Sequence, residues 1–310
     1  MIRTPWAFAR GTVQREGARG EQWLADLPAV VARMMERWHC VPDGEVMHGG
    51  VALVVPVLRP ATGPAVLKVS FPHPGNRHEP DALAAWDGHG AVRLLERDDA
   101  EFAMLLERTD PTTLAQVTST DEVAAVAGRV SRRLAVPAPP GLPRLRAQAD
   151  AWQEQLRRDS AEFPHVLPHT VVARAMASVR ELAHGQPDVL IHGDMNARNI
   201  LKATREPWLA ADPKGWAGDP AYDCGTLVKS RSVALLGQGD LRTSLHRLID
   251  VFTEAAGLDR RRARHWAQLQ AVQAAFSGRR RGFRRAREGE ELRRLVSLAD
   301  ELATLLTTPA

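Results

Sequence analysis

Patterns typical of β-strands occupy only two parts of this chain, and this restriction narrows the folds that it can adopt. Four β-branched or apolar runs lie in the first third of the chain, at 51–60, 65–71, 91–98 and 101–110. The first two runs are joined by "ATGP", whose Gly and Pro predict a hairpin. A helical pattern precedes them at 23–38, and a short helix closed by Gly88 is predicted after the hairpin. This part therefore predicts a small antiparallel sheet with one inserted helix.

The rest of the chain has mostly helical patterns. Apolar residues recur at helical spacing between 123 and 134, and a Pro-rich stretch at 136–143 breaks this pattern. The second strand-like part is short, at 188–213, and helix is predicted again after it. A sheet-rich part followed by a mainly helical part predicts an α+β, two-lobed fold. We expect an N-terminal lobe at 1–107 and a C-terminal lobe at 108–310, because the last strand of the first lobe ends there.

The composition narrows the class of protein. The longest apolar run, at 51–58, is far shorter than the roughly 20 residues that cross a bilayer. The N-terminal segment is polar and basic and has no apolar stretch of signal-peptide length. The two cysteines, Cys40 and Cys224, match no metal-site spacing. These features predict a cytoplasmic protein without a membrane partner.

The charge of the chain is modest although its isoelectric point is high. The formal net charge is +4 and the pI is about 9.6, because only four of the 41 basic residues are lysines. Bulk charge therefore gives little support to a nucleic-acid partner. The five arginines within 279–285 keep that alternative open. The sequence does not indicate an oligomeric state.

One loop in the second strand-like part carries an unusual set of polar side chains. The segment "LIHGDMNARNIL" places Asp194 and Asn199 between two apolar flanks, and "AADPKG" adds Asp212 shortly afterwards. Asn199 and Asp212, at adjacent strand ends, offer the oxygen ligands that Mg²⁺ prefers and shares with substrate phosphates. Asp194 is then placed to face an attacking hydroxyl and to accept its proton. This division of labour predicts phosphoryl transfer.

The motifs in and around this loop also resemble a known family. An aspartate, an asparagine five positions later and a further aspartate have the order of a kinase catalytic loop and its metal-binding segment. "HGDMNARN" followed by "DPKG" and "GDPAYD" resembles the aminoglycoside phosphotransferases of the protein-kinase-like superfamily. "REPWLAADPKGWAGDPAYD" and "HEPDALAAWDGHGAVRLLE" are similar, more narrowly, to the streptomycin 6-phosphotransferase and hydroxyurea phosphotransferase group. The similarity runs from about Trp23 to Tyr222 and is poor at the C-terminus.

The resemblance implies a fold, an activity and a role for each matching residue. The fold would be protein-kinase-like, with a β-rich N-lobe and a mainly helical C-lobe. Asp194 would be the catalytic aspartate, and Asn199 and Asp212 would be the ligands of Mg²⁺. The implied reaction moves the γ-phosphoryl group of ATP to a hydroxyl of a small molecule, expected to be an antibiotic of the streptomycin or hydroxyurea type.

The same resemblance implies a nucleotide site in the N-terminal lobe. Lys68 in "AVLKVSF" matches the lysine that contacts the nucleotide phosphates, and Glu79 in "RHEPDAL" matches the helix glutamate that pairs with it. "MLLERTD" around Glu107 resembles the hinge whose backbone meets the adenine.

Several polar residues also have a plain structural interpretation. Glu79 would suit an exposed first helical turn, where acidic groups favour the helix dipole. His192 is expected to form structural hydrogen bonds, and Asp219, before Pro220, to cap a helix. Asp223 would either brace the catalytic loop, as the resemblance suggests, or simply lie in the first turns of that helix.

Departures from the family pattern leave the acceptor open. "DPK" replaces the Asp-Phe-Gly of protein kinases, which makes a protein substrate a weaker alternative. The arginines at 279–285 form either a solvated helical face or a wall of the acceptor cleft. In the second case they would favour a neutral or anionic small metabolite over a polycation. A catalytically inactive nucleotide-binding relative is a further alternative, against which the presence of every expected site residue argues.

Overall fold

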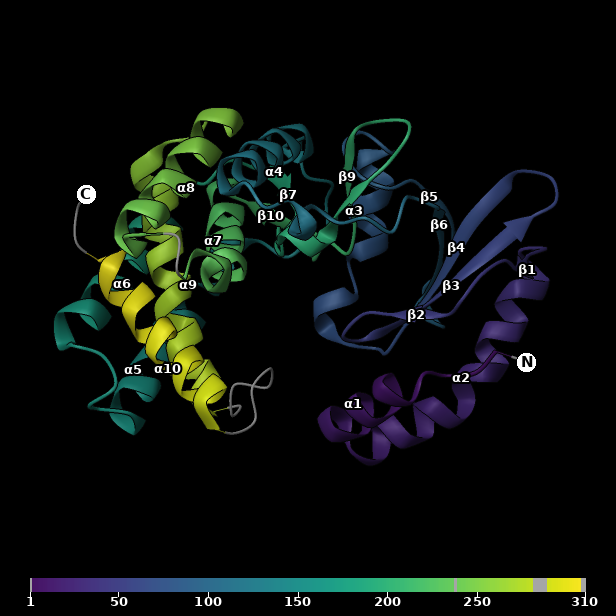
Figure 1. The fold of residues 1–310 in the computed structure, drawn as a ribbon, viewed down its shortest axis with the longest axis horizontal. Helices are drawn as coiled ribbons and strands as arrows, with labels where there is room; N and C mark the ends of the chain where they lie inside the picture. Colours follow the sequence, from purple (N-terminus) through teal and green to yellow (C-terminus); the bar gives the residue numbers. More distant parts are fainter. Residues whose placement is uncertain (1, 237–238, 281–288, 308–310) are drawn as a thin grey trace. The chain divides into compact units, whose positions relative to one another are not determined.

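The computed structural model describes residues 2–236, 239–280 and 289–307. The chain divides into two compact units, Met1–Asp110 and Pro111–Ala310. The first unit contains a sheet, and most of the helices belong to the second (Figure 1). The division that we expected at residue 107 lies just before this boundary.

The sheet of the first unit is antiparallel throughout. Its strand order is β1-β3-β4-β6-β5, with β2 paired to β3. The β3–β4 hairpin pairs Ala52 with Ser70 and Arg59 with Gly63, so the turn is where the sequence predicts it. The antiparallel sheet of the expected N-lobe is thus confirmed. The six strands are β1 Val41–Pro42, β2 Met47–His48, β3 Ala52–Arg59, β4 Gly63–Ser70, β5 Leu94–Asp98 and β6 Ala103–Glu107.

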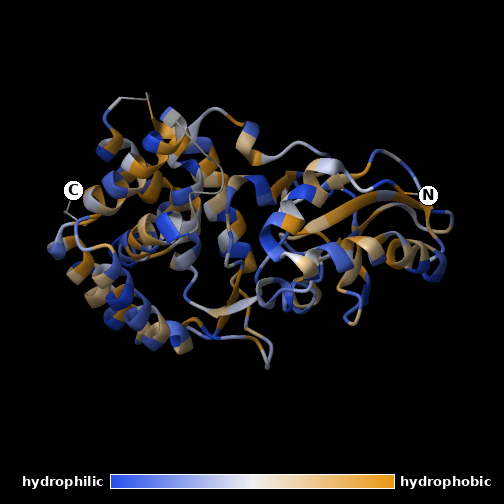
Figure 2. Cartoon of the chain, turned by 90° about the horizontal axis from the view of Figure 1, so that it is seen from below, coloured by the Kyte–Doolittle hydropathy of each residue, from blue (hydrophilic) through white to orange (hydrophobic). Residues whose placement is uncertain are grey.

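One face of this sheet is covered by helix α2, Ala18–Arg37. Leu67 and Val69 of β4 lie in one core cluster with Leu27 and Val31 of α2. Successive side chains of a strand point to opposite faces, so Lys68 of β4 faces away from this cluster. The strands are accordingly mostly orange, the hydrophobic end of the colour scale, in Figure 2.

The first unit has two further helices. Helix α1, Trp6–Glu16, was not predicted, because its pattern is short and not clearly amphipathic. Helix α3, Glu79–Trp86, is the predicted insertion between β4 and β5. It ends before Gly88, because Asp87 already adopts the left-handed conformation at φ 45° that closes the helix.

The second unit is built around helix α9, which packs against α6, α7, α8 and α10. Its buried face includes Trp266 and Phe276, which are among the largest fully buried side chains. Most of the other helices carry apolar and polar faces (Figure 2). The mainly helical C-lobe is thus confirmed. Its α-helices are α4 Thr120–Leu134, α5 Ala149–Glu162, α6 His169–Ala183, α7 Ala221–Leu235, α8 Leu241–Ala256, α9 Arg260–Arg280 and α10 Gly289–Leu305.

The strands of the second unit form two separate antiparallel pairs. β7, Val189–Ile191, pairs with β10, Trp216–Gly218, and β8, Ile200–Lys202, pairs with β9, Trp208–Ala210. The sequence led us to expect one small sheet and did not predict β10, whose three residues show no periodicity. Among the described helices, none has the length and apolar character needed to span a bilayer.

Helices α4 and α8 approach closely at a glycine. A Cβ atom built on Gly128 of α4 would lie 2.5 Å from the carbonyl oxygen of Phe252 and 2.9 Å from Cβ of Ala255, both on α8. The first of these is a backbone atom, so the contact could be relieved only by moving a helix.

We therefore predict that Gly128→Ala destabilises the second unit. Overpacking of this kind costs about 1–3 kcal/mol, and the free energy of unfolding in urea should fall by that amount. The matched control is Gly11→Ala in α1, where no atom lies within 4 Å of the added Cβ. The control should be neutral or stabilising by up to about 1 kcal/mol, because alanine has the higher helix propensity. An unchanged stability of Gly128→Ala would contradict the close approach.

Candidate active site

The loop "HGDMNARN" leaves the end of β7 in the second unit. His192 and Gly193 follow this strand directly, and Asp194 comes next. Asp194, Asn199 and Asp212 are each partly exposed, so a ligand in solvent can reach these side chains.

The buried carboxylate of Asp223 holds the start of this loop. Its Oδ1 accepts the Gly193 N–H at 2.8 Å and its Oδ2 accepts the His192 N–H at 3.1 Å. Burial raises the pKa of Asp223 to about 7, and these two hydrogen bonds oppose the rise. Of the two interpretations of Asp223, the structure supports the one in which it braces the loop.

His192 ties the same loop to the end of β9. Its Nε2 lies 3.0 Å from the carbonyl oxygen of Ala211, and its Nδ1 lies 3.2 Å from the Asp194 amide. The carbonyl can only accept and the amide can only donate, so the ring is neutral with its proton on Nε2. Burial lowers the pKa of His192 to about 4, in agreement with a neutral ring. The expected structural role of His192 is confirmed.

The structure brings Asp194, Asn199 and Asp212 to one place. Asn199 donates from Nδ2 to the carbonyl oxygen of Asp194 at 3.0 Å. Asn199 precedes β8 and Asp212 follows β9, so the antiparallel pairing of these strands puts both residues at the same end. The Ala211 N–H also donates to the Asn199 carbonyl at 2.8 Å, which extends the β8–β9 pairing by one residue on each strand.

The backbone around this cluster adopts conformations that few residues tolerate. Asp212 has φ 58°, in the left-handed region, where a non-glycine residue is strained and where functional residues are often found. Gly193 has φ 78°, and a Cβ atom there would lie 3.0 Å from the Cβ of Lys214 and from Cδ1 of Trp216. Gly193 therefore allows the close approach of the "DPKG" segment to the loop.

The sequence predicted the role of Asp219 only in part, because its further partners are distant along the chain, and it did not predict the role of Asn196. Asp219 accepts a hydrogen bond from the Ala221 amide, as the predicted cap would, but Oδ2 also accepts from Arg262 and, at 2.6 Å, from Trp266 Nε1. It therefore fastens the start of α7 to α9. Asn196 accepts the Arg198 N–H at 3.0 Å and donates to Asp194, so it shapes the turn before Asn199.

The first unit contains a buried ion pair. Lys68 Nζ lies 2.6 Å from Glu79 Oε1, and both side chains are almost completely buried, at 8% and 1% exposure. Burial excludes the alternative in which Glu79 lies in an exposed helical turn. A buried charge is tolerated only with a partner, so the pair fixes α3 against β4.

Glu107 is the last residue of β6. Its N–H donates to the Arg93 carbonyl at 2.9 Å, and its Oε2 accepts the Arg93 N–H at 3.0 Å. The Glu107 amide is therefore already used inside the sheet, and a backbone contact to a nucleotide would come from its carbonyl or from the residues that follow.

Two arginines of the basic C-terminal stretch are paired with carboxylates. Arg279 makes two bonds to Asp300, at 2.8 and 2.7 Å, and Arg280 Nη1 lies 2.6 Å from Asp159 Oδ1. The remaining arginines of 279–285 lie outside the described residues.

Comparison with known proteins decides the family. A family model described as aminoglycoside/hydroxyurea antibiotic resistance kinase matches residues 37–282, which is most of the chain. The chain belongs to this family. The match continues well beyond Tyr222, so the resemblance covers more of the helical unit than the motifs indicated.

Relatives of known activity agree with this assignment. A streptomycin 6-kinase of Streptomyces glaucescens is 37% identical over 278 residues, covering 89% of this chain and 91% of that protein. A hydroxyurea phosphotransferase of Kitasatospora aureofaciens is 36% identical over 277 residues, covering 88% of this chain and 79% of that protein. The chain is therefore a small-molecule kinase that phosphorylates a hydroxyl group, and its family implies ATP as the donor.

Solved structures confirm the protein-kinase-like fold. A choline/ethanolamine kinase family protein of Mesorhizobium loti aligns with a TM-score of 0.61 at 16% identity, covering 90% of this chain and 96% of that one. A macrolide 2'-phosphotransferase of Brachybacterium faecium aligns with a TM-score of 0.55 at 19% identity, covering 92% and 99%.

The neutral His192 predicts a pH dependence of stability. A histidine whose pKa falls from 6.5 to about 4 on folding binds fewer protons in the folded state. Its contribution is therefore present above pH 6.5 and is lost as the pH falls toward about 4. In His192→Asn this group cannot titrate, and the amide oxygen can still accept the Asp194 N–H. The difference in unfolding free energy between the two proteins should shrink by up to about 3 kcal/mol over this range. A difference that does not vary with pH would show that the ring is not held neutral.

Asp223→Asn tests the brace of the kinase loop. An amide has one acceptor oxygen, so one of the two loop N–H groups would face an NH₂ group. We expect turnover to fall about 10-fold to 100-fold and stability to fall by about 1–3 kcal/mol, the cost of a buried unsatisfied group. The control is Asp240→Asn, the exposed cap of α8, where asparagine caps equally well. Equal effects of the two substitutions on turnover would argue against the brace.

Proposed function

We propose that Asp194 is the catalytic residue of this kinase, and that it orients the acceptor hydroxyl and takes its proton. The main support for this role is the fixed geometry of the loop, which is held by Asp223, His192 and Asn199. A carboxylate positioned in this way can act without rearrangement during the reaction. Asp194 is also partly exposed, as a group that must reach a substrate has to be.

We propose that Asn199 and Asp212 hold Mg²⁺. Asn199 uses its amide nitrogen to donate to the Asp194 carbonyl, so its Oδ1 remains oriented as an acceptor. Asp212 contributes a carboxylate at the same end of the β8–β9 pair. Among the described residues, no group of three or more His, Cys, Asp or Glu side chains could form a full metal cage. A site with two protein oxygens fits Mg²⁺, which takes its remaining ligands from water and substrate phosphates and neutralises the charge of the transferred group.

The nucleotide contacts of the first unit are proposed for Lys68 and for the end of β6. Glu79 accepts from Lys68 and so holds the ammonium group at a fixed place on the sheet. We assign to Lys68 the contact with the phosphates of ATP. Because the Glu107 amide is already bonded to Arg93, we assign the adenine contact to the backbone from the Glu107 carbonyl onward.

The relatives indicate two kinds of acceptor. One is named for streptomycin, a polycation, and another for hydroxyurea, a small neutral molecule, at nearly equal identity. Identity alone therefore does not choose between them. We propose an antibiotic of this general type, and the kinase of a neutral or anionic metabolite is the alternative.

Asp194→Asn tests the proposed chemistry. The amide cannot accept the hydroxyl proton, so turnover measured as ADP release with Mg²⁺ and streptomycin or hydroxyurea should fall about 10²-fold to 10⁴-fold. Nucleotide affinity and the unfolding midpoint should change little, because two of the hydrogen bonds that fix the loop use the backbone of Asp194. The third, from Asn196 to Asp194 Oδ1, can still be accepted by the side-chain oxygen of asparagine. The control is Asp188→Asn, an exposed residue just before β7. Near-normal turnover of Asp194→Asn would remove the proposal, and ADP release by neither wild type nor variant with either compound would favour the alternative acceptor, a neutral or anionic metabolite.

A further inference from the structure

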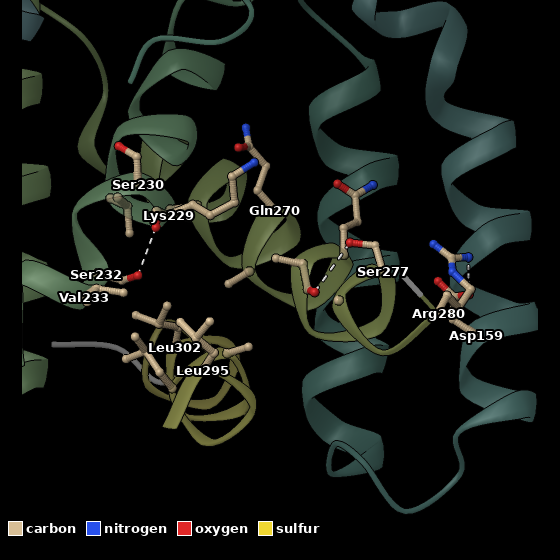
Figure 3. A pocket seen from close by; sticks show the side chains of 18 of the residues that line it. Asp159, Lys229, Ser230, Ser232, Val233, Gln270, Ser277, Arg280, Leu295 and Leu302 are labelled. Carbon is tan, nitrogen blue, oxygen red and sulfur yellow. Dashed lines mark hydrogen bonds and ion pairs between the residues drawn. The ribbon is translucent and has the colours of Figure 1, made fainter. Parts of the chain in front are cut away.

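A pocket of 540 Å³ lies among α4, α8 and the start of β9 in the second unit, and we call it the α4–β9 pocket. It is separate from a larger pocket among α5, α7, α9 and α10, where the Asp159 carboxylate is paired with Arg280 (Figure 3). None of Asp194, Asn199 and Asp212 belongs to the described lining of the α4–β9 pocket. Its volume is within the range of about 300–1,000 Å³ that is typical of sites for small-molecule ligands.

Part of the lining of the α4–β9 pocket is apolar. Val126 and Val130 of α4 are 4% and 5% exposed, and Ala255 of α8 completes this apolar surface. Trp208, the first residue of β9, adds a half-buried indole ring. Within the described part of the chain, this side chain makes no contact with another aromatic ring and no hydrogen bond. A flat apolar group of a ligand can therefore pack against the ring.

The rest of the lining is basic. Arg129, Arg132 and Arg133 of α4 line the pocket and are exposed, and no aspartate or glutamate belongs to its described lining. The formal charge of this lining is therefore +3. Residues three and four positions apart lie on the same side of a helix, so like charges at these positions repel one another. A bound anion would relieve this repulsion.

Two of these three arginines have no partner among the described residues. Arg133 forms an ion pair with Glu206, whose carboxylate also accepts from Arg205 at 3.1 Å. Arg129 and Arg132 make no hydrogen bond and no ion pair with any residue that the structure describes. Their N–H donors are therefore available to an anionic group in the pocket, and hydrogen bonds between two charged groups are the strong ones.

We propose that the α4–β9 pocket is a second ligand site of this protein, and that it binds an organic anion with a flat aromatic body. The carboxylate or phosphate of the ligand accepts hydrogen bonds from Arg129 and Arg132, and its ring packs on Trp208. A guanidinium group binds either kind of anion through two parallel hydrogen bonds. A neutral molecule of the same shape would leave the repulsion among the arginines in place. The inference goes beyond the proposed function and does not depend on it.

Two matched probes test this inference. The probes 2-naphthoate and 2-naphthamide share the same ring system and differ by one negative charge. Their affinities for the full-length protein would be measured by calorimetry at neutral pH without nucleotide. We expect naphthoate to bind about tenfold to 100-fold more tightly, because hydrogen bonds to a charged group are stronger than those to a neutral group by about that factor.

Substitutions locate this preference in the pocket. Arg129→Gln and Arg132→Gln should each weaken the binding of naphthoate about tenfold and change that of naphthamide less than about twofold. The control is Arg180→Gln on α6, an exposed arginine outside the pocket lining and without a partner among the described residues, which should leave both affinities unchanged. Trp208→Leu should weaken both probes about twofold to tenfold and keep their ratio, because the ring contacts the part that they share.

Three results of these measurements would each overturn the inference: equal affinities of the two probes, an equal loss of naphthoate binding in Arg180→Gln, or no binding of naphthoate to the wild type. Binding of single-stranded DNA that depends on Arg129 and Arg132, without binding of naphthoate, would also overturn it and assign these arginines to a nucleic-acid partner. The unfolding midpoints of Arg129→Gln and Arg132→Gln should match that of the wild type, because both side chains are exposed. ADP release separates the two proposals, since its absence with every acceptor would reject the kinase function and leave the preference for naphthoate unchanged.

Discussion

The buried carboxylate of Asp223 is the interaction on which the reactive part of the second unit depends. A loop that follows a strand of only three residues has little secondary structure of its own to hold it. Asp223 compensates by accepting two successive amides, those of His192 and Gly193, directly before Asp194. His192 links the loop to the end of β9, because one ring nitrogen accepts from the Asp194 amide and the other donates to the Ala211 carbonyl. The loop that carries Asp194, the end of β9 and the first turn of α7 thereby form one hydrogen-bonded network, in which each member loses a partner if another moves.

The first unit also uses buried ionisable groups to position its residues, in this case two groups of opposite charge. Lys68 and Glu79 are both removed from water, and each is stable there only because the other is present. The pair lies on one face of the sheet, and the opposite face belongs to the apolar cluster under α2. In both units a buried ionisable group thus acts as a positioning device, while Asp194, Asn199 and Asp212 of the second unit remain partly exposed. The strained backbone of Asp212 fits this division, because the surrounding hydrogen bonds can hold a conformation that the residue alone would not choose.

Local sequence patterns were sufficient wherever the structure is itself local. The hairpin around "ATGP", the helix after Lys68 and the aspartate and asparagine of the "HGDMNARN" loop all follow from residues close together in the chain. The predictions were wrong or incomplete where geometry is made by distant segments. Asp219 is bonded by Arg262 and Trp266, 43 and 47 residues away, so no periodicity near Asp219 could indicate more than a cap. β10 has only three residues, too few to show a strand periodicity in the sequence. It forms a strand because it pairs with β7. The ion pair between Asp159 and Arg280 depends in the same way on two residues that are 121 positions apart.

Helix α7 has one anchored end and one end whose residues have fewer fixed partners. Its first turn carries Asp223, which holds the loop that carries Asp194, and Lys229 and Val233 line a pocket of the second unit further along. At a rise of 1.5 Å per residue, Asp223 and Val233 are separated by about 15 Å along a rigid rod. The start of the rod is anchored through Asp219 to α9, so substitutions in its later turns need not disturb the anchored end. Substitutions can therefore accumulate at one end of this helix while the other end keeps the geometry of the loop that carries Asp194.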